Sequence, residues 1–256
     1  MKILINNKLV APKDAKIPVL SEAFMFGYGV FETLRTYNNK KIFKSKEHID
    51  RLFNSAKSLD LKIRYPKLQI MQQLEKTAKA SRHALQKIKI IATKDTLIII
   101  STPLRETPQV YKGVTCKTVK LLRPIPQAKT LSYLSSYLSH EAAVKEGFYE
   151  AILIDEKSSI YEGAYSNIFW FENETLCTRK DKVLKGITAE TVMEISPFKT
   201  KFKTISLLSL LEKQEIFLTQ TTKGIVPITK INNTKINNGI VGKKTARLMK
   251  LYPPLS

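Results

Sequence analysis

Residues 123–127, RPIPQ, limit the possible folds of this chain more than any other short stretch. Each proline biases its predecessor toward an extended backbone, so we expect neither a helix nor a regular strand to run through them. The segments before and after this stretch both mix strand-like and helix-like patterns. The 256 residues are also enough for two hydrophobic cores. We therefore predict an α/β (α+β) protein with a smaller N-terminal α+β domain (residues 1–122), an interdomain linker (123–128) and a larger C-terminal α/β domain (129–256).

The N-terminal half carries the signals of a mixed domain. A first strand is predicted over residues 2–6, and GVFETLRTY and KKIFK flank Asn38 and Asn39 as the arms of a hairpin. A helix is predicted from Ser45, its N-cap, because four apolar residues fall on one stripe: Ile49, Leu52, Phe53 and Ala56. A second helix is expected over about residues 67–82. Strands at KIKIIATK, TLIIIST and GVTCKTVKLL complete this domain.

The C-terminal half begins with a predicted helix from Thr130. Strands are expected at EAILID, SIYEG, NIFWFE and TLCT, followed by a helix after the GIT triplet at residues 186–188. Further strands are expected at KFKTI, EIFLTQ and IVPITKI, and a short helix near residues 242–251.

The net charge of +21 comes from lysines spread along the whole chain rather than from one cluster. No recognition-helix, zinc-finger or RNP-like motif accompanies them, so we predict no nucleic-acid partner, although anionic substrates gain from the field. No apolar run approaches the roughly 20 residues of a membrane span, and the N-terminus is too soon polar for a signal peptide. With only Cys116 and Cys177, expected to be reduced, we predict a cytoplasmic protein without a metal site.

Lys129 stands out among the lysines because it follows the linker and precedes a helix-like pattern. Thr130 is a natural N-cap, and apolar residues recur at helical spacing: Leu131, Leu134, Leu138 and Ala142. A helix N-terminus disfavours a second positive charge, which lowers the pKa of an amine in a dry site. A neutral lysine amine is what Schiff-base chemistry requires. These residues alone favour an ordinary surface lysine that precedes a helix.

Three other segments are candidates for ligand binding. Glu162 lies among apolar strand residues shortly before Asn167, and a carboxylate there needs a cationic partner unless it points to water. Gly186 and Ile187 precede Thr188, the predicted N-cap of a helix whose free N–H groups suit a phosphate. Thr221 and Thr222 follow an apolar strand, where they supply hydroxyl donors or simply form a polar turn.

Taken in order, these segments resemble the fold-type IV family of pyridoxal-phosphate enzymes. This family includes branched-chain and D-amino-acid aminotransferases and aminodeoxychorismate lyases. The similarity runs from FGYGVFETLRTYNNKKIFKSKEHIDRLFNSAKSL through AKTLSYL and EAILIDEKSSIYEGAYSNIFWF to LKGITAETVMEI and EIFLTQTTKGIVPI. Five blocks in register, with comparable spacing, are far more specific than any one of them.

The resemblance implies a role for each matching residue. Lys129 would hold pyridoxal 5'-phosphate as a Schiff base and shuttle a proton, while Glu162 would pair with the pyridine nitrogen. Arg51 of HIDRL would bind the phosphate, and Tyr133, expected one helical turn after Lys129, would approach the phenolic oxygen. The other implied cofactor-binding residues are Asn167, Gly186, Ile187, Thr188 and Thr221. The family also implies a homodimer, with the cofactor between the two domains.

The substrate pocket departs from familiar members of the family. Members often have Asp where Tyr28 stands, and Phe31 replaces a tyrosine common in aminotransferases. Lys94 and Asp95 stand where members often carry Arg-Gly, and lysine lacks the bidentate fork of arginine. Four residues are the candidates for substrate binding: Phe31, Arg35, Lys94 and Thr222.

The resemblance leaves the activity open between related chemistries. An aminotransferase moves an amino group from an amino acid to a 2-oxo acid, whereas an aminodeoxychorismate lyase eliminates pyruvate and gives 4-aminobenzoate. We favour the aminotransferase, the commoner activity, with small amino acids and 2-oxo acids as substrates. GYGVFETLR, SNIFWF and the short chain support the lyase alternative. A non-enzymatic basic binding protein on the same scaffold is a third possibility.

Overall fold

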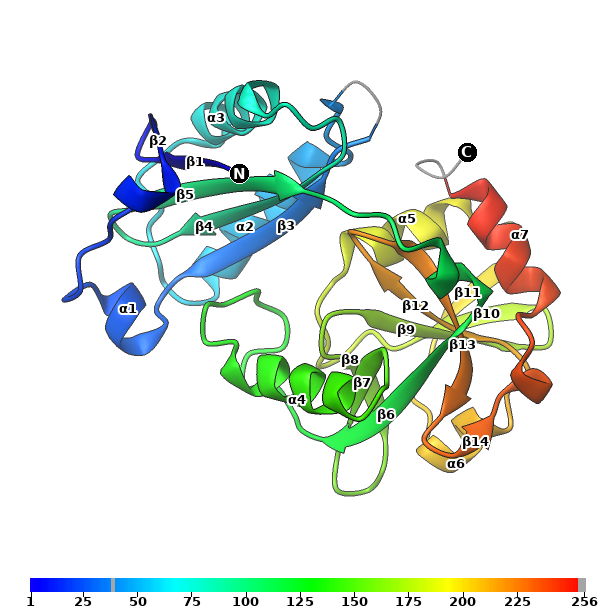
Figure 1. Ribbon diagram of the computed structural model, residues 1–256. Helices are drawn as coiled ribbons and strands as arrows, with labels where there is room; N and C mark the ends of the chain where they lie inside the picture. Colours follow the sequence, from blue (N-terminus) through cyan, green and yellow to red (C-terminus); the bar gives the residue numbers. More distant parts are fainter. Residues whose placement is uncertain (38–39, 253–256) are drawn as a thin grey trace. The chain divides into compact units, whose positions relative to one another are not determined.

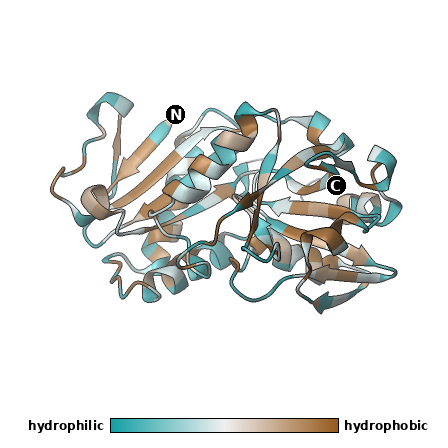
Figure 2. Cartoon of the chain, turned by 90° about the horizontal axis from the view of Figure 1, so that it is seen from below, coloured by the Kyte–Doolittle hydropathy of each residue, from teal (hydrophilic) through white to brown (hydrophobic). Residues whose placement is uncertain are grey.

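The computed structural model describes residues 1–37 and 40–252, which form two compact units. Unit 1 contains residues 1–106 and 128–133, and unit 2 contains residues 107–127 and the chain from 134 onward. Figure 1 shows a separate sheet in each unit, and Figure 2 shows that the strands of both sheets are hydrophobic over much of their length. No helix in the described part of the chain is long and apolar enough to cross a membrane.

Unit 1 is built on a five-stranded antiparallel sheet in the order β2-β1-β5-β4-β3. Its strands are β1 (Lys2–Ile5), β2 (Lys8–Val10), β3 (Val30–Arg35), β4 (Gln86–Ala92) and β5 (Leu97–Pro103). Helices α2 (Ser45–Lys57) and α3 (Lys67–Ala80) contact this sheet. Their apolar residues pack against the even-numbered apolar residues of β4, which are buried. The short helix α1 (Glu22–Phe26) precedes β3.

The sheet of unit 1 has a second face with a different composition. Because side chains alternate along a strand, Phe31, Thr33 and Arg35 of β3 point away from α2, as do Lys87 and Lys89 of β4. Thr33 is paired with Lys89, and Phe31 with Ile91. This face is therefore aromatic and basic, whereas the face under the helices is aliphatic.

Unit 2 contains a mixed nine-stranded sheet, ordered β11-β10-β9-β12-β13-β6-β7-β8, with β14 (Thr234–Lys235) paired to β13. The other strands are β6 (Val114–Lys120), β7 (Glu150–Ile154), β8 (Ile160–Gly163), β9 (Asn167–Glu172), β10 (Thr175–Thr178), β11 (Lys199–Phe202), β12 (Ile216–Gln220) and β13 (Gly224–Ile231). The helices are α4 (Leu134–Lys145), α5 (Ile187–Ile195), α6 (Leu207–Leu211) and α7 (Lys243–Leu251). Trp170, Ile168, Leu218 and Val226 lie in the main core.

The predicted domain boundaries were wrong in two places. Strand β6, expected to complete the N-terminal domain, pairs in parallel with β13 and β7 and so belongs to the sheet of unit 2. Residues 128–133, expected to begin the C-terminal domain, pack in unit 1, where Thr130 forms a β-bridge with Val30. Strand pairing partners are non-local, so the sequence pattern of β6 alone could not choose between two sheets.

The helix predicted from Thr130 begins four residues later, at Leu134. Its buried residues include Ser136 and Ala143, while Leu134 and Leu138 of the predicted stripe are exposed. The prediction of a helix was therefore correct. The prediction that its apolar stripe packs against the protein was wrong. Lys129 and Tyr133 are consequently not one helical turn apart.

Other elements mostly match the prediction. At the start of α2, Lys44 is the N-cap and Ser45 is the first helical residue, and the second arm of the predicted hairpin is reduced to a bridge between Thr36 and Ile42. Asn38 and Asn39, its predicted turn, lie outside the described residues. Among the α-helices and strands of the described residues, four short ones were not predicted: β2, α1, α6 and β14.

Candidate active site

Lys129 is held in unit 1 by its backbone. Its N–H donates to Ser55 Oγ at 3.0 Å, and its carbonyl accepts from the N–H of Phe31 at 2.9 Å. The side-chain amine reaches over two rings, with Nζ 4.4 Å from the centroid of Phe31 and 5.9 Å from that of Tyr133. These two rings meet edge to face at 5.2 Å. The structure therefore brings Lys129, Tyr133 and Phe31 together, although not through a helix.

Arg51 lies on the same helix as Ser55 and forms a buried triad with His48 of that helix and Glu32 of β3. Its Nε and Nη2 donate to Glu32 Oε1 and Oε2 at 2.7 and 2.8 Å, and His48 Nδ1 lies 2.8 Å from Glu32 Oε2. Because Arg51 and Ser55 are four residues apart on α2, the helix places the guanidinium one turn from the residue that anchors Lys129. The bidentate pair with Glu32 fixes the plane of the guanidinium.

The charges of this triad are set by burial and pairing. Burial would raise the pKa of Glu32, but the charge and hydrogen bonds of Arg51, with the hydrogen bond of His48, hold it well below its usual range. Burial lowers the pKa of His48, against the opposing effect of Glu32, and the positive charges of Arg51 and Lys129 lower it further. At neutral pH the triad is thus an ionised Glu32, a cationic Arg51 and a neutral His48.

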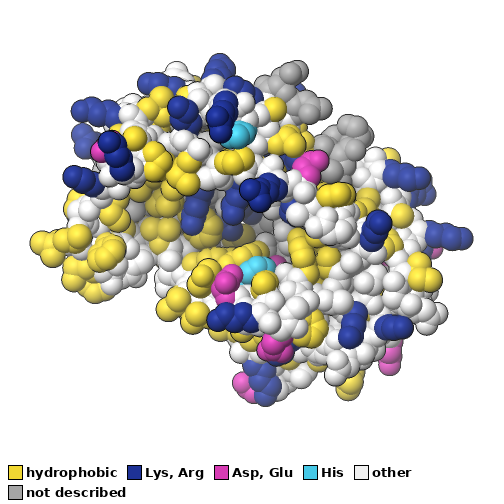
Figure 3. Space-filling model, in the orientation of Figure 1, with side chains coloured by type: hydrophobic (Ala, Val, Ile, Leu, Met, Phe, Trp, Pro, Cys, Tyr) yellow, Lys and Arg dark blue, Asp and Glu magenta, His cyan; other side chains and the backbone are white. Residues whose placement is uncertain are grey.

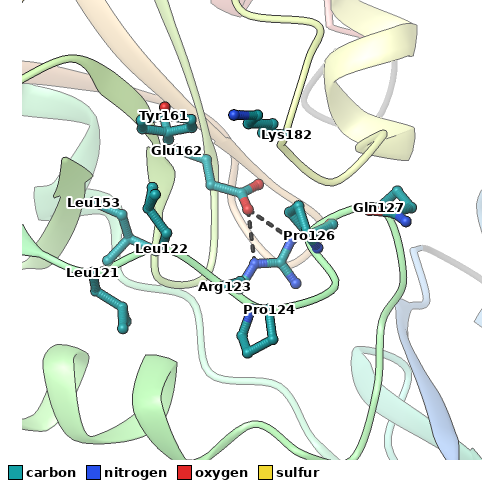
Figure 4. A pocket seen from close by; sticks show the side chains of 10 residues that line it. All are labelled: Leu121, Leu122, Arg123, Pro124, Pro126, Gln127, Leu153, Tyr161, Glu162 and Lys182. Atoms are coloured by element: carbon teal, nitrogen blue, oxygen red, sulfur yellow. Dashed lines mark hydrogen bonds and ion pairs between the residues drawn. The ribbon is translucent and has the colours of Figure 1, made fainter. Parts of the chain in front are cut away.

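Glu162 forms a second buried ion pair, in unit 2. Its Oε1 accepts from Arg123 Nε at 2.8 Å and lies 2.6 Å from Arg123 Nη2 (Figure 4). Its Oε2 accepts from the N–H of Leu184 at 2.9 Å and from Asn167 Nδ2 at 3.4 Å. With Arg123, Tyr161 and Lys182, Glu162 also lines a cavity of about 310 Å³. These contacts fix the direction of the carboxylate.

Asn167 connects Glu162 to the start of α5. Its Nδ2 also donates to the carbonyl of Leu184 at 2.8 Å, and its Oδ1 lies against Gly186 so closely that a Cβ there would collide with it. Gly186 is the N-cap of α5, with no side-chain cap, so Thr188 is not the N-cap that the sequence predicted but the second helical residue. The first N–H groups of α5 are the ones that a helix leaves for an anion.

Thr219 adds a polar group to this cluster. It is paired with Asn167 across β12 and β9, and its buried hydroxyl has no hydrogen-bond partner among the described residues. A buried hydroxyl without a partner is costly, and a bound ligand with polar atoms would satisfy it. Thr221 and Thr222 lie in the turn after β12, both half-buried.

The turn between β8 and β9 is anchored by a fully buried carboxylate. Glu150 accepts from Tyr165 N, Ser166 Oγ and Ala151 N, and His140 Nδ1 lies 3.1 Å from it. A Cβ on Gly163 would collide with Ser166 Oγ. Since Glu162 and Asn167 stand at the two ends of this turn, Glu150 holds both in place.

The other substrate-pocket candidates have diverse surroundings. Arg35 is buried, stacks on Tyr37 at 4.2 Å and pairs with Glu106 at 3.4 Å. Lys94 is exposed at the turn between β4 and β5, in a depression that Lys62 also lines. Arg35 and Lys94 as substrate ligands thus stay predictions.

Sequence reasoning missed several residues of this arrangement: Glu32, His48, Lys89, Arg123, Glu150 and Thr219. A glutamate in the middle of an apolar strand was the available signal for Glu32, since such a carboxylate requires a cation. Arg123 was read only as the start of the linker. Nothing in its local sequence indicates that it folds back onto Glu162.

Comparisons with known proteins bear on this arrangement. The family model of class IV aminotransferases matches residues 29–231. A Methanocaldococcus jannaschii protein named "Putative branched-chain-amino-acid aminotransferase" is 33% identical, with 98% of this chain and 95% of its own covered. The D-alanine aminotransferase of Listeria monocytogenes is 29% identical, with the same coverage. The structure of the T.th. branched-chain amino acid aminotransferase with pyridoxamine 5'-phosphate has a TM-score of 0.90 at 26% identity, covering 98% of this chain and 92% of that one.

The chain therefore belongs to the class IV aminotransferases. It is a pyridoxal-phosphate-dependent enzyme that transfers an amino group between an amino acid and a 2-oxo acid. This confirms the family, fold class, cofactor and favoured activity predicted from the sequence. The lyase alternative is not favoured, because these relatives are aminotransferases.

The residues present fit pyridoxal phosphate. Unit 2 offers the oriented carboxylate of Glu162 for a cationic ring nitrogen, the uncapped start of α5 for a phosphate and an unpartnered hydroxyl at Thr219, as far as the described residues show. Unit 1 offers a lysine amine against two aromatic rings, and an oriented arginine.

Proposed function

We propose that Lys129 attaches the cofactor covalently, that Glu162 pairs with its ring nitrogen, and that Arg51 and the start of α5 bind its phosphate. The observation that carries this proposal is that unit 2 has one position that favours a cation and another, close by, that favours an anion. Asn167 touches both Glu162, which favours a cation, and Gly186 at the start of α5, where an anion is favoured. A small ligand with a protonated ring nitrogen and a phosphate matches both preferences. Ile187, Thr188 and Thr221 complete the proposed phosphate site.

Pyridoxal phosphate, when bound, supplies an aldehyde that condenses with amines and a ring that draws electrons from the substrate Cα. Glu162, oriented by its contact with Arg123, would be the anionic partner of a protonated ring nitrogen. Lys129 moves the proton at the substrate Cα, and Tyr133 orients the ring beside it. Glu32 holds Arg51 in the orientation that receives the phosphate.

Absorption spectroscopy tests these assignments. The purified protein, incubated with pyridoxal phosphate, should show the near-visible band of a lysine-bound cofactor. Adding a single amino acid without an oxo acid should convert this band to that of the pyridoxamine form. Lys129→Ala should lose the band and nearly all turnover while the protein stays folded. Lys145→Ala, at the end of α4, is the matched control and should behave like the wild type.

Two outcomes would contradict the proposal. Substantial turnover in Lys129→Ala would remove this lysine from its role. A wild-type protein with no cofactor band at any pyridoxal phosphate concentration would overturn the whole assignment.

We infer that the amino donor has an apolar side chain. The edge-to-face rings of Phe31 and Tyr133 give an apolar wall beside the amine of Lys129. The relatives are named for branched-chain amino acids and for D-alanine, which share this property. A panel of L- and D-amino acids in the half-reaction checks it, and a preference for polar donors would contradict it.

We also infer a homodimer, from two exposed apolar surfaces. In residues 17–26 of unit 1, six apolar side chains are each at least 44% exposed: Ile17, Val19, Leu20, Phe24, Met25 and Phe26 (Figure 3). Helix α4 of unit 2 exposes Leu134, Tyr137, Leu138 and Val144. Apolar surfaces of this kind are typical of interfaces. A monomeric mass in solution at micromolar concentration would overturn this inference, and Leu20→Glu with Phe24→Glu should weaken the dimer.

The unpaired Cys116 and Cys177 are consistent with a cytoplasmic location.

A further inference from the structure

The ring of Phe31 lies near the side-chain nitrogens of two lysines. Lys129 Nζ is 4.4 Å from its centroid, and Lys89 Nζ is 4.7 Å from the same point. The two nitrogens are therefore at most 9.1 Å apart, the sum of 4.4 and 4.7 Å. A second cation thus accompanies the amine to which we assign the cofactor.

The position of Lys89 follows from strand geometry. Lys89 pairs with Thr33 on the face of the unit 1 sheet opposite α2 and α3, and Phe31 lies on this face two residues along β3. Side chains related in this way lie diagonally across an antiparallel pair and are within reach of each other. The fold therefore fixes the Lys89 stem beside Phe31.

The surroundings of Lys89 leave its charge uncompensated. The residue is half-buried, and its ammonium has no carboxylate or hydrogen-bond acceptor among the described residues. Burial lowers the pKa of Lys89, and the positive charge of Lys87 lowers it further. An anion bound beside Lys89 would compensate this charge.

We propose that Lys89 binds a carboxylate of the substrate that reacts at Lys129. This inference rests on the proposed role of Lys129 and names the residue that recognises the acid group. A carboxylate is the anion that both substrates of an aminotransferase share. The 9.1 Å limit is compatible with the carboxylate at the reacting carbon and with one at the end of a dicarboxylic side chain.

Arg35 and Lys94, the cations predicted from the sequence to bind substrate, are less well placed than Lys89 for this role. Arg35 lies four residues from Phe31 along β3 and contacts Glu106 and Tyr37. Lys94 lies five residues beyond Lys89, in an exposed turn lined also by Asp60 and Lys62.

The test compares amino acids with their amides, which keep the reacting amine but lack the negative charge. The first substrate pair is L-leucine and L-leucinamide, or D-alanine and D-alaninamide if the D-enantiomer reacts, and L- or D-glutamate is the dicarboxylic substrate. In Lys89→Gln, kcat/KM for the amino acid should fall about 100-fold, mostly through KM, while the value for the amide is unchanged. Lys89→Arg should recover much of this loss.

Lys87→Gln is the matched control, because it removes an exposed charge from the same strand and the same face. It should leave the selectivity for acid over amide within a factor of about three, as expected of an exposed charge. The cofactor band should be normal in every Lys89 variant. A defect in that band in the wild type would count against the proposed function instead.

The outcomes separate the two carboxylates. A loss for all amino acids, with amides spared, identifies the carboxylate at the reacting carbon, and a loss confined to glutamate identifies the distal one. Equal losses for acids and amides, or no loss at all, would overturn the proposal.

Discussion

Two buried glutamates, one in each unit, are both paired with arginine but are held in different ways. Glu32 of unit 1 is completely buried under α2, with Arg51 and His48 from that helix as its partners. Glu162 of unit 2 is paired with Arg123 from the proline-containing connector, and its second oxygen is bound by a backbone N–H and by Asn167. The first pair therefore joins a helix to a sheet, whereas the second belongs to a loop cluster that includes the start of α5.

This difference suggests that Glu32 stabilises the fold, whereas Glu162 takes part in catalysis. In the protein without cofactor, removing the charge of Glu32 takes the buried carboxylate partner away from Arg51, so this substitution should mainly affect stability. Removing the charge of Glu162 leaves several polar neighbours that relax more easily, so its substitution should mainly affect catalysis. The predictions below test this contrast, from the largest expected effect to the smallest.

The largest effect is expected for Glu32→Gln. The free energy of unfolding should fall by about 3–5 kcal/mol, because Arg51 keeps its charge in a buried site while its anionic partner is gone. Denaturant titration followed by circular dichroism measures this change. Glu47→Gln, in the exposed first turn of α2, should change the unfolding free energy by less than about 1 kcal/mol. If both variants were equally stable, the buried pair would contribute nothing beyond a surface one.

Glu162→Gln should show the opposite balance. We expect cofactor binding to persist and kcat to fall on the order of 100-fold, because the ring nitrogen loses the anion that keeps it protonated. Single-turnover kinetics with one amino acid measure the chemical step directly. Glu156→Gln, in the exposed turn before β8, should retain the wild-type rate. Unchanged single-turnover rates in Glu162→Gln would exclude this residue from the mechanism.

The smallest effect concerns His48 and pH. Its pKa is lowered in the folded protein, so below its ordinary value near 6.5 the unfolded chain takes up a proton that the folded chain does not. Stability from this group is thus complete above about pH 6.5 and falls as the pH decreases, by at most about 1.4 kcal/mol per pH unit. His48→Gln should flatten the unfolding free energy between pH 7 and 5, and His83→Gln should not. An unaltered slope in His48→Gln would contradict this assignment.

The same rule gives the acid limit of the Glu32 contribution. Its pKa is lowered, so its stabilisation is present above the ordinary value of about 4.5 and is lost as the pH falls through the folded value. Glu32→Gln should therefore differ less from the wild type in strong acid than at neutral pH.

Local pattern was sufficient for most elements of the fold. Apolar periodicity located α2, α3, β4 and β5 to within a few residues, because these elements bury the stripe or the alternate face that their sequence displays. Periodicity failed for α4, where the apolar stripe is exposed and a small residue, Ala143, is buried. It failed for β6 because a strand pattern carries no information about which sheet it joins.

The sequence by itself determined the family and the candidates Lys129, Arg51 and Glu162, because blocks of residues in a fixed order carry that information. It also indicated that a carboxylate in an apolar strand needs a cation. Only the tertiary structure decided which cation is used, since Arg123 reaches Glu162 and Arg51 reaches Glu32 through folding of distant segments. It likewise placed Lys89, rather than Lys94, beside the ring that Lys129 contacts. The physical reason is that ion pairs and ring contacts depend on distances of a few ångströms, which are set by strand register and packing.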